Sequence, residues 1–159
     1  MSDRLTMWLT TNPVMTWLIR HGASRIDPIL FRASGGRFTS MGPPSMPMLT
    51  LTVPGRRTGK KRSVHLACLE RGDDFLVVAS AMGQPRHPAW SYNLDADPEV
   101  EVQVAGRRFL ARARLLTGEE KREVWDEVHR VIPQMKVYET RTHRDIRVYC
   151  LSPAGDDSN

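Results

Sequence analysis

The residues best suited to chemistry form one short basic segment. Residues 55–62, with the sequence Gly-Arg-Arg-Thr-Gly-Lys-Lys-Arg, crowd five cations into a predicted turn. Like charges repel, so this crowding is unfavourable unless an anion neutralises it. Glycine lets the backbone turn sharply, and the planar guanidinium of arginine matches phosphate oxygens. We interpret the segment as an anion-binding loop, with the solvated tip of a basic hairpin as the alternative. Its spacing differs from that of the Walker phosphate-binding loop.

A second segment, residues 79–94, joins a strand end to a helix start. It begins with Ala-Ser-Ala-Met-Gly over 79–83 and reaches Pro88, which can open a helix. Small residues at a strand end let a flat ring or a phosphate approach the backbone closely. The helix start adds free N–H groups and a field that favours an anion. Trp90 and Leu94 are four residues apart, so we expect both to pack in the core.

The other reactive residue types show no arrangement that could carry a reaction alone. Cys68 and Cys150 lack ligand spacing, so we expect reduced, packed thiols and no metal site. The histidines have no ligand spacing, and a lone His65 within a predicted strand is usually structural. Neither a Ser-His-Asp set nor a pair of carboxylates is evident. An enzyme with this sequence would therefore take its reactive atom from a cofactor.

The composition fits a single globular domain with an anionic partner. The chain has 159 residues, of which 40% are hydrophobic and 26% are charged. Its net charge of +5 allows nucleic acid, a phosphorylated cofactor or an anionic membrane face as the partner. No apolar run approaches the roughly 18 residues that a membrane span needs. The start of the chain lacks the apolar core of a signal peptide.

We expect an α+β fold that is mainly β: a small barrel of about six antiparallel strands, an N-terminal helix and one long helix. The connections between strands are mostly too short for parallel crossovers. The long helix follows a predicted capping box at Thr117 and Glu120 and ends at Pro133. A shorter helix opens at Pro88. The predicted strands are residues 48–53, 63–70, 75–79, 100–104, 109–115 and 146–151.

The N-terminal segment is predicted to be separate from the barrel. Asn12 and Pro13 can start a helix that Gly22 stops. This helix either packs on its own domain or lies at a membrane surface through Trp8 and Trp17. We therefore divide the chain into a helical segment and linker (1–34), a barrel domain (35–153) and a disordered tail (154–159).

The basic segment, the 79–83 segment and residues 88–103 together resemble the deazaflavin-dependent nitroreductase family of actinobacteria. The last of these reads Pro-Ala-Trp-Ser-Tyr-Asn-Leu-Asp-Ala-Asp-Pro-Glu-Val-Glu-Val-Gln, and the likeness runs from about Gly35 to Pro153. The resemblance implies a split β-barrel of the FMN-binding, pyridoxamine-phosphate-oxidase-like type. It also implies coenzyme F-420, a deazaflavin with a phospholactyl and oligoglutamate tail. Such an enzyme passes a hydride from reduced F-420 to a quinone, a nitroaromatic or an activated enone.

The resemblance also implies roles for single residues. Arg57 and Arg62 match the positions that hold the phosphate, and Lys60 and Lys61 are extra cations for the tail carboxylates. Ser80 matches a small polar residue beside the deazaflavin ring. Tyr138 matches a tyrosine on the acceptor side, so Tyr138 and Ser80 are the candidate catalytic residues. The expected cofactor contacts are Arg56, Arg57, Thr58, Gly59, Lys60, Lys61, Arg62, His65, Ala79, Ser80, Ala81, Met82, Gly83, Pro88, Ala89, Trp90 and Asn93.

The sequence departs from the family pattern at several of these positions. His65 and Leu66 stand where the family has Pro-Leu, and Ala81 replaces a lysine that contacts the cofactor. Ile132 and Met135 replace aromatic residues expected near the acceptor. The cofactor loop is thus kept, whereas the acceptor pocket is altered.

The expected partners follow from this interpretation. We expect a small-molecule acceptor, with menaquinone as a candidate, and a monomer or homodimer. The expected location is the cytoplasm, with the N-terminal helix as a contact to the inner face of the membrane. FMN in place of F-420 is one alternative. A non-enzymatic, basic nucleic-acid-binding module is another, although the cations cluster at one turn and do not alternate with exposed aromatic residues.

Overall fold

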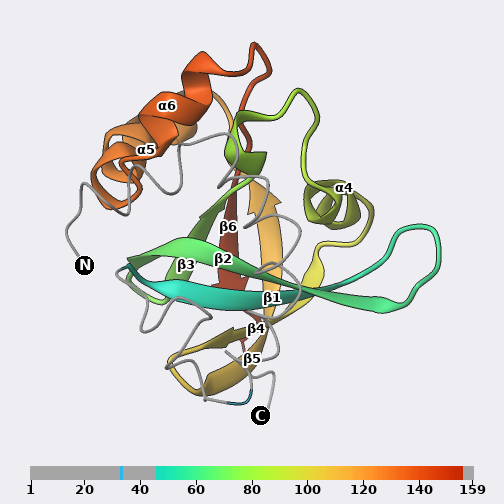
Figure 1. Cartoon of the computed structure of the whole chain (residues 1–159). Helices are drawn as coiled ribbons and strands as arrows, with labels where there is room; N and C mark the ends of the chain where they lie inside the picture. Colours follow the sequence, from blue (N-terminus) through green and yellow to red (C-terminus); the bar gives the residue numbers. More distant parts are fainter. Residues whose placement is uncertain (1–32, 34–45, 156–159) are drawn as a thin grey trace.

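Six antiparallel strands close into a barrel in the computed structural model, which describes Ala33 and residues 46–155 (Figure 1). The strand order is β1-β2-β3-β6-β5-β4, and β4 pairs with β1 to close the ring. The predicted six-stranded antiparallel barrel is confirmed, with strand ends that shift by one or two residues. The strands are β1 (Met48–Pro54), β2 (Lys61–Arg71), β3 (Asp74–Val78), β4 (Glu99–Val104), β5 (Arg107–Leu115) and β6 (Val148–Pro153).

Alternate residues of the strands fill the barrel. Leu49, Leu51 and Val53 of β1 point inward and are completely buried, as the two-residue period of a strand requires. Trp90 and Leu94 close this interior cluster from helix α4 (Ala89–Ala96), as their spacing predicted. The helix begins directly after Pro88, whose backbone is extended.

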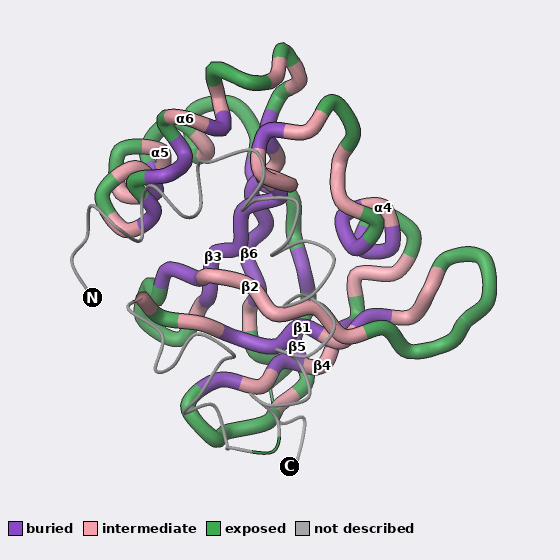
Figure 2. The backbone as a smooth tube through the Cα atoms, viewed as in Figure 1, coloured by how far each residue is buried: buried purple, intermediate pink, exposed green. Residues whose placement is uncertain are grey.

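Two further helices cover the outer face of β3 and β6 (Figure 2). Helix α5 (Gly118–Val131) is the predicted long helix, and α6 (Met135–Thr140) follows it. Helix α6 has only six residues and comes after Pro133, and a helix this short has no periodic pattern from which it could be predicted. Both helices bury apolar side chains against the outside of the barrel. The buried members of this outer cluster are Leu69, Leu76, Val78, Leu116, Val124, Val128, Ile132, Met135, Tyr138, Ile146, Val148 and Cys150.

The predicted capping box at the start of α5 is wrong. Thr117 occupies the N-cap position, but its side chain makes no capping hydrogen bond. The carboxylate of Glu120 instead receives two hydrogen bonds from the Arg114 guanidinium of β5, at 2.6 and 2.7 Å. A bidentate charge-assisted pair is stronger than a single bond to a main-chain amide. Glu120 therefore pairs with Arg114 of the neighbouring strand and does not cap the helix.

Several predictions concern parts of the chain outside the described residues. These are the N-terminal helix, its contact with a membrane and most of the tail after Pro153. Within the described part of the chain, no helix is both long enough and apolar enough to cross a membrane.

Candidate cofactor-binding cleft

A cleft of about 570 Å³ separates the β1–β2 loop from helix α4. It brings the basic segment together with the α4 part of the second segment, whereas residues 79–83 of that segment are not among the residues that line it. No carboxylate occurs among the described residues that line it, so its cations stay uncompensated within the cleft. The lining residues are Gly55, Arg56, Arg57, Thr58, Arg62, Ser63, Val64, Ala89, Trp90 and Asn93.

The basic loop is held in shape by its own main chain. The amide of Gly55 donates to the carbonyl of Lys60 at 2.9 Å, and the carbonyl of Gly55 accepts from the amides of Thr58 and Gly59 at 3.0 and 2.7 Å. Gly59 has a φ of +65°, a left-handed conformation that glycine adopts without strain. These bonds fix the path of the loop before any ligand arrives, which lowers the entropy cost of binding.

Arg56 and Asn93 connect the loop to helix α4. The main-chain N–H of Arg56 donates to Oδ1 of Asn93 at 3.1 Å, and Asn93 is buried. The guanidinium of Arg56 also lies 4.8 Å from the centre of the Tyr92 ring, within cation–π range. Two contacts therefore set the width of the cleft from the side of the loop.

The cations at the tip of the hairpin are placed differently. All five cations of the loop are exposed, but Lys60 and Lys61, like Gly59, do not belong to the described lining of the cleft. Nζ of Lys61 lies 3.8 Å from a carboxylate oxygen of Glu101 on β4, a contact that partly balances its charge. Of the five loop cations, Arg56, Arg57 and Arg62 line the cleft.

The Ala-Ser-Ala-Met-Gly segment forms a strained turn at the end of β3. It contains the 3-10 turn η2 (Ala81–Gly83). Ala81 and Met82 have φ values of +46° and +55°, which cost non-glycine residues on the order of 1–3 kcal/mol each. Strain of this size persists only where surrounding structure enforces it. Such turns are concentrated at functional sites.

Helix α6 helps to hold the strained turn in place through a close contact at Gly83. This residue has a φ of +78°, and an added Cβ would lie 2.6 Å from the carbonyl oxygen of Tyr138. Glycine is therefore required on two grounds, conformation and space. The contact sets the turn against α6 and places Ser80 at the junction between the barrel and that helix.

Sequence analysis missed Arg144, which holds the turn from the other side. Arg144 donates through Nε to the carbonyl of Gln84 at 2.9 Å, and through Nη2 to the carbonyl of Ser80 at 2.5 Å. Its Nη1 lies 3.1 Å from Nδ1 of His87. Because Arg144 lies about 60 residues from these partners, no local pattern could have identified it.

A polar network that is buried at Ser91 and Tyr149 and reaches the surface at Asp95 connects α4 to β6. The hydroxyl groups of Ser91 and Tyr149 lie 2.8 Å apart, and the Tyr149 hydroxyl donates to Asp95 at 2.9 Å. Arg147 donates to the same carboxylate at 2.6 Å. Burial raises the pKa of Tyr149, so its hydroxyl stays protonated and can act as the donor. The network anchors α4 to β6 through Ser91 and Asp95, which do not line the cleft, and sequence analysis missed it.

A family match decides the identity of this arrangement. The model of the F420H(2)-dependent quinone reductase family matches residues 23–153, which include the whole barrel and both segments of the site.

The chain belongs to this family.

Individual relatives agree with the family match. An F420H(2)-dependent quinone reductase of Mycobacterium tuberculosis is 32% identical over 145 residues, which cover 87% of this chain and 97% of the relative. The structure of an F420-H2 dependent reductase, FDR-A, is 36% identical and covers 67% of this chain and 94% of that one, with a TM-score of 0.62. A domain-swapped dimer is 31% identical and covers 86% and 98%, with a TM-score of 0.65.

Membership in the quinone reductase family confirms the expected resemblance and the expected enzyme class. An F-420-dependent reductase with coenzyme F-420 as its cofactor is therefore the right interpretation. FMN is the weaker alternative. The basic loop fits this cofactor on its own chemistry, since three guanidinium groups without a carboxylate suit a tail that carries phosphate and several carboxylates.

The remaining predicted contacts lie around the cleft or away from it. Pro88 precedes α4 at the rim, and His65 lies on β2 with Nδ1 3.5 Å from the Thr50 hydroxyl. Ala79 is completely buried and packs in the barrel interior. Tyr138, predicted on the acceptor side, is only 7% exposed and packs in the outer cluster.

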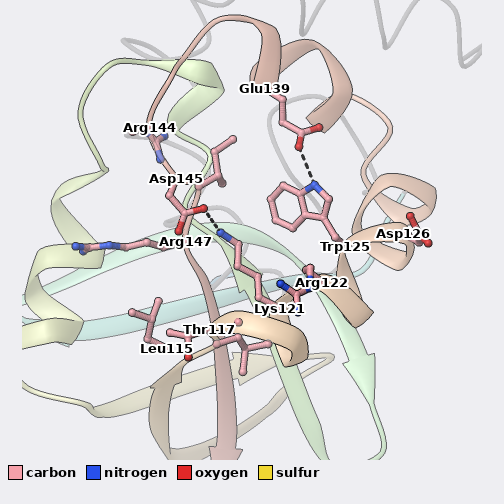
Figure 3. A pocket seen from close by; sticks show the side chains of 13 residues that line it. Leu115, Thr117, Lys121, Arg122, Trp125, Asp126, Glu139, Arg144, Asp145 and Arg147 are labelled. Carbon is pink, nitrogen blue, oxygen red and sulfur yellow. Dashed lines mark hydrogen bonds and ion pairs between the residues drawn. The ribbon is translucent and has the colours of Figure 1, made fainter.

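A second cavity, of about 670 Å³, lies between α5, α6 and the segment that leads into β6 (Figure 3). Two of the four cations among the described residues that line it pair with carboxylates. Lys121 pairs with Asp145, and Arg147 pairs with Asp95. In the same wall, the Trp125 indole donates to Glu139 at 2.7 Å. These pairings make the second cavity a poorer place for a polyanion, although it is larger than the cleft.

Proposed function

We propose that this protein reduces a quinone with a hydride from reduced F-420, and that the cleft between the β1–β2 loop and α4 holds the anionic part of the coenzyme. One observation carries the proposal. Arg56, Arg57 and Arg62 line a cleft that has no carboxylate among its described residues, and the loop that bears them is hydrogen-bonded into shape. Cations held so close together favour binding of a polyanion.

Different residues serve different parts of the coenzyme in this proposal. Arg57 and Arg62 hold the phosphate, while Lys60 and Lys61 at the exposed tip meet the carboxylates of the tail. The deazaflavin ring lies toward the Ala79–Gly83 turn and the start of α4. When bound in its reduced form, the coenzyme supplies a hydride from its central ring carbon.

The protein contributes position and a proton donor. Negative charge builds on the acceptor oxygen as the hydride arrives, so a hydroxyl aimed at that oxygen stabilises it. Ser80 is half-buried on the strained turn, and we propose its hydroxyl for this role. Tyr138 packs in the outer cluster with little exposure, which favours Ser80 of the two predicted donors.

The proposed acceptor is a quinone. Ile132 and Met135, which replace expected aromatic residues, are 8% and 1% exposed and pack in the outer cluster.

We propose menaquinone as the physiological quinone, reached at the cytoplasmic face of the membrane through residues 1–25. Co-sedimentation with liposomes, with and without those residues, tests the membrane contact, and equal partitioning would end it. A sizing column distinguishes monomer from homodimer.

The decisive experiment measures binding and turnover together. Wild-type protein is titrated with F-420, then given reduced F-420 and a menaquinone analogue, a nitroaromatic or an enone, with NADPH plus FMN as the control. Arg57→Ala and Arg62→Ala should each weaken F-420 binding by about 1.5–3 kcal/mol, the range for hydrogen bonds to charged groups. Arg130→Ala, an exposed cation on α5, is the matched control. Unchanged affinity in both loop variants would remove the cleft from the proposal.

A further inference from the structure

All three guanidinium nitrogens of Arg144 make polar contacts with one turn, residues 80–87. Nε reaches the carbonyl of Gln84, Nη2 reaches the carbonyl of Ser80, and Nη1 meets Nδ1 of His87. These three partners span the whole connection from the end of β3 to the start of α4. A guanidinium presents its donors in a rigid plane, so three simultaneous bonds fix the relative positions of all three partners.

Besides Arg144, the close contact of Gly83 with α6 and two hydrogen bonds within the turn constrain its path. Within it, the amide of Gly83 donates to the carbonyl of Ser80 at 3.0 Å, and that of Gln84 donates to the carbonyl of Ala81 at 3.1 Å. Between these bonds lie Ala81 and Met82, both in the left-handed conformation. Their strain favours relaxation of the turn, and Arg144 opposes it by holding the two ends.

Arg144 is itself fixed by its neighbours in sequence (Figure 3). Asp145 pairs with Lys121 of α5, and Arg147 pairs with Asp95 of α4. Ile146 between them is buried in the outer cluster. The segment is thus anchored on two helices, and the half-buried Arg144 has a defined origin from which to reach the turn.

We propose that Arg144 is a positioning residue for hydride transfer: it holds the Ser80–His87 turn in its strained form and thereby orients the Ser80 hydroxyl and the adjoining backbone toward the reacting groups. The inference rests on the proposed function, because it assigns the ring of the coenzyme to this turn. It predicts an effect on catalysis that is larger than the effect on binding, since the phosphate and tail are held by the separate basic loop.

The test compares Arg144→Gln and Arg144→Lys with the control Arg130→Gln. Both Arg144 variants should lower kcat at least tenfold while the Kd for F-420 changes less than threefold. Lysine keeps the charge but offers one ammonium in place of a planar fork, so it should fail to rescue the rate. The thermal midpoint of each variant verifies folding, and Arg144→Lys replaces Arg144→Gln if the latter is unfolded.

Two readouts on the protein without coenzyme test the same contact. Hydrogen exchange at the amides of Gly83 and Gln84 should become faster in the Arg144 variants and stay unchanged in Arg130→Gln. In Arg144→Gln, the pKa of His87 measured by NMR should rise, because a neighbouring cation is removed. A fully active Arg144→Gln, or one whose turn exchanges as slowly as wild type, would overturn the inference. Failure of wild-type protein to oxidise reduced F-420 would instead overturn the proposed function.

Discussion

The main-chain N–H of Arg56 donates a hydrogen bond to the side-chain oxygen of Asn93 over 3.1 Å. This bond links a loop between two strands to the middle of a helix that begins more than 30 residues later. Asn93 is 8% exposed, so water competes poorly for the acceptor of this bond. The width of the cleft depends on it, and both walls carry residues proposed to meet the coenzyme.

Replacing Asn93 should therefore affect stability and binding together. Asn93→Ala removes the acceptor and should cost about 1–3 kcal/mol of unfolding free energy, because a partly buried donor loses its partner. It should also weaken F-420 binding by roughly three- to tenfold, equivalent to about 1 kcal/mol. Urea unfolding and titration with the fluorescent coenzyme measure the two effects. Asn93→Asp keeps the acceptor but adds a negative charge beside the arginines, so it should retain more stability and bind more weakly. Wild-type affinity in Asn93→Asp would contradict the assignment of the cleft.

The pair formed by Ser91 and Tyr149 should be strongly coupled. Their hydroxyl groups lie 2.8 Å apart, and Ser91 is completely buried. Tyr149→Phe should lose about 1–3 kcal/mol of stability, because Ser91 is left without this partner. In the double variant with Ser91→Ala, the second change should cost less than it does alone, with a coupling of roughly 0.5–3 kcal/mol. Urea unfolding of the four proteins gives the coupling, and strictly additive losses would show that the hydroxyl groups do not interact.

The barrel and the basic loop were predictable because local patterns encode them. Alternation in β1 and β4 marks inward-facing residues such as Leu51 and Val102, and five cations within residues 55–62 mark a loop of unusual charge. The start of α4 was predictable from Pro88. These features need only neighbouring residues to take effect.

The features that sequence analysis missed depend on contacts between residues that are distant along the chain. Arg144 is unremarkable in its own segment, and its importance comes from carbonyl groups of Ser80 and Gln84 that the fold brings to it. Glu120 was predicted to take part in a helix cap. Its actual partner, Arg114, lies on a neighbouring strand, so the local helix pattern does not reveal it. The burial of Tyr138, a predicted acceptor-side residue, in the outer cluster was also not evident from the sequence, because it depends on a short helix. In each case the deciding partner comes from another element.

Gly83 should tolerate alanine less well than Gly72, a glycine of similar backbone conformation elsewhere in the barrel. Alanine there would carry a left-handed conformation and a Cβ only 2.6 Å from the carbonyl oxygen of Tyr138. Gly72→Ala is the matched control, since Gly72 has a φ of +63° and nothing within 4 Å of its added Cβ. The control should lose about 1–2 kcal/mol from conformation alone. Gly83→Ala should lose clearly more and should also lower turnover, because α6 and the turn must move apart. Equal losses in urea unfolding would show that the contact with Tyr138 is easily relieved.

His87 should make stability depend on pH near neutrality. Burial lowers its pKa, and the nearby cations of Arg147 and Arg144 lower it further, against smaller opposing effects of Asp95 and Asp145. The folded protein therefore prefers neutral imidazole, whose Nδ1 can accept a hydrogen bond from Arg144. In the unfolded chain His87 has an ordinary pKa of about 6.5. Between that value and the lowered one, the unfolded chain binds a proton that the folded protein does not.

The sign of the effect follows from this difference. The contribution of His87 is fully present above pH of about 6.5 and is lost as the pH falls through the lowered pKa of the folded protein. His87→Asn keeps an acceptor for Arg144 and cannot titrate, so its unfolding free energy should fall less between pH 7.5 and 5 than that of wild type. His143→Asn, at an exposed position of the connection into β6, is the control substitution. If His87→Asn and wild type lose stability in parallel, His87 is not held neutral by the two arginines, and its contact with Arg144 does not depend on protonation.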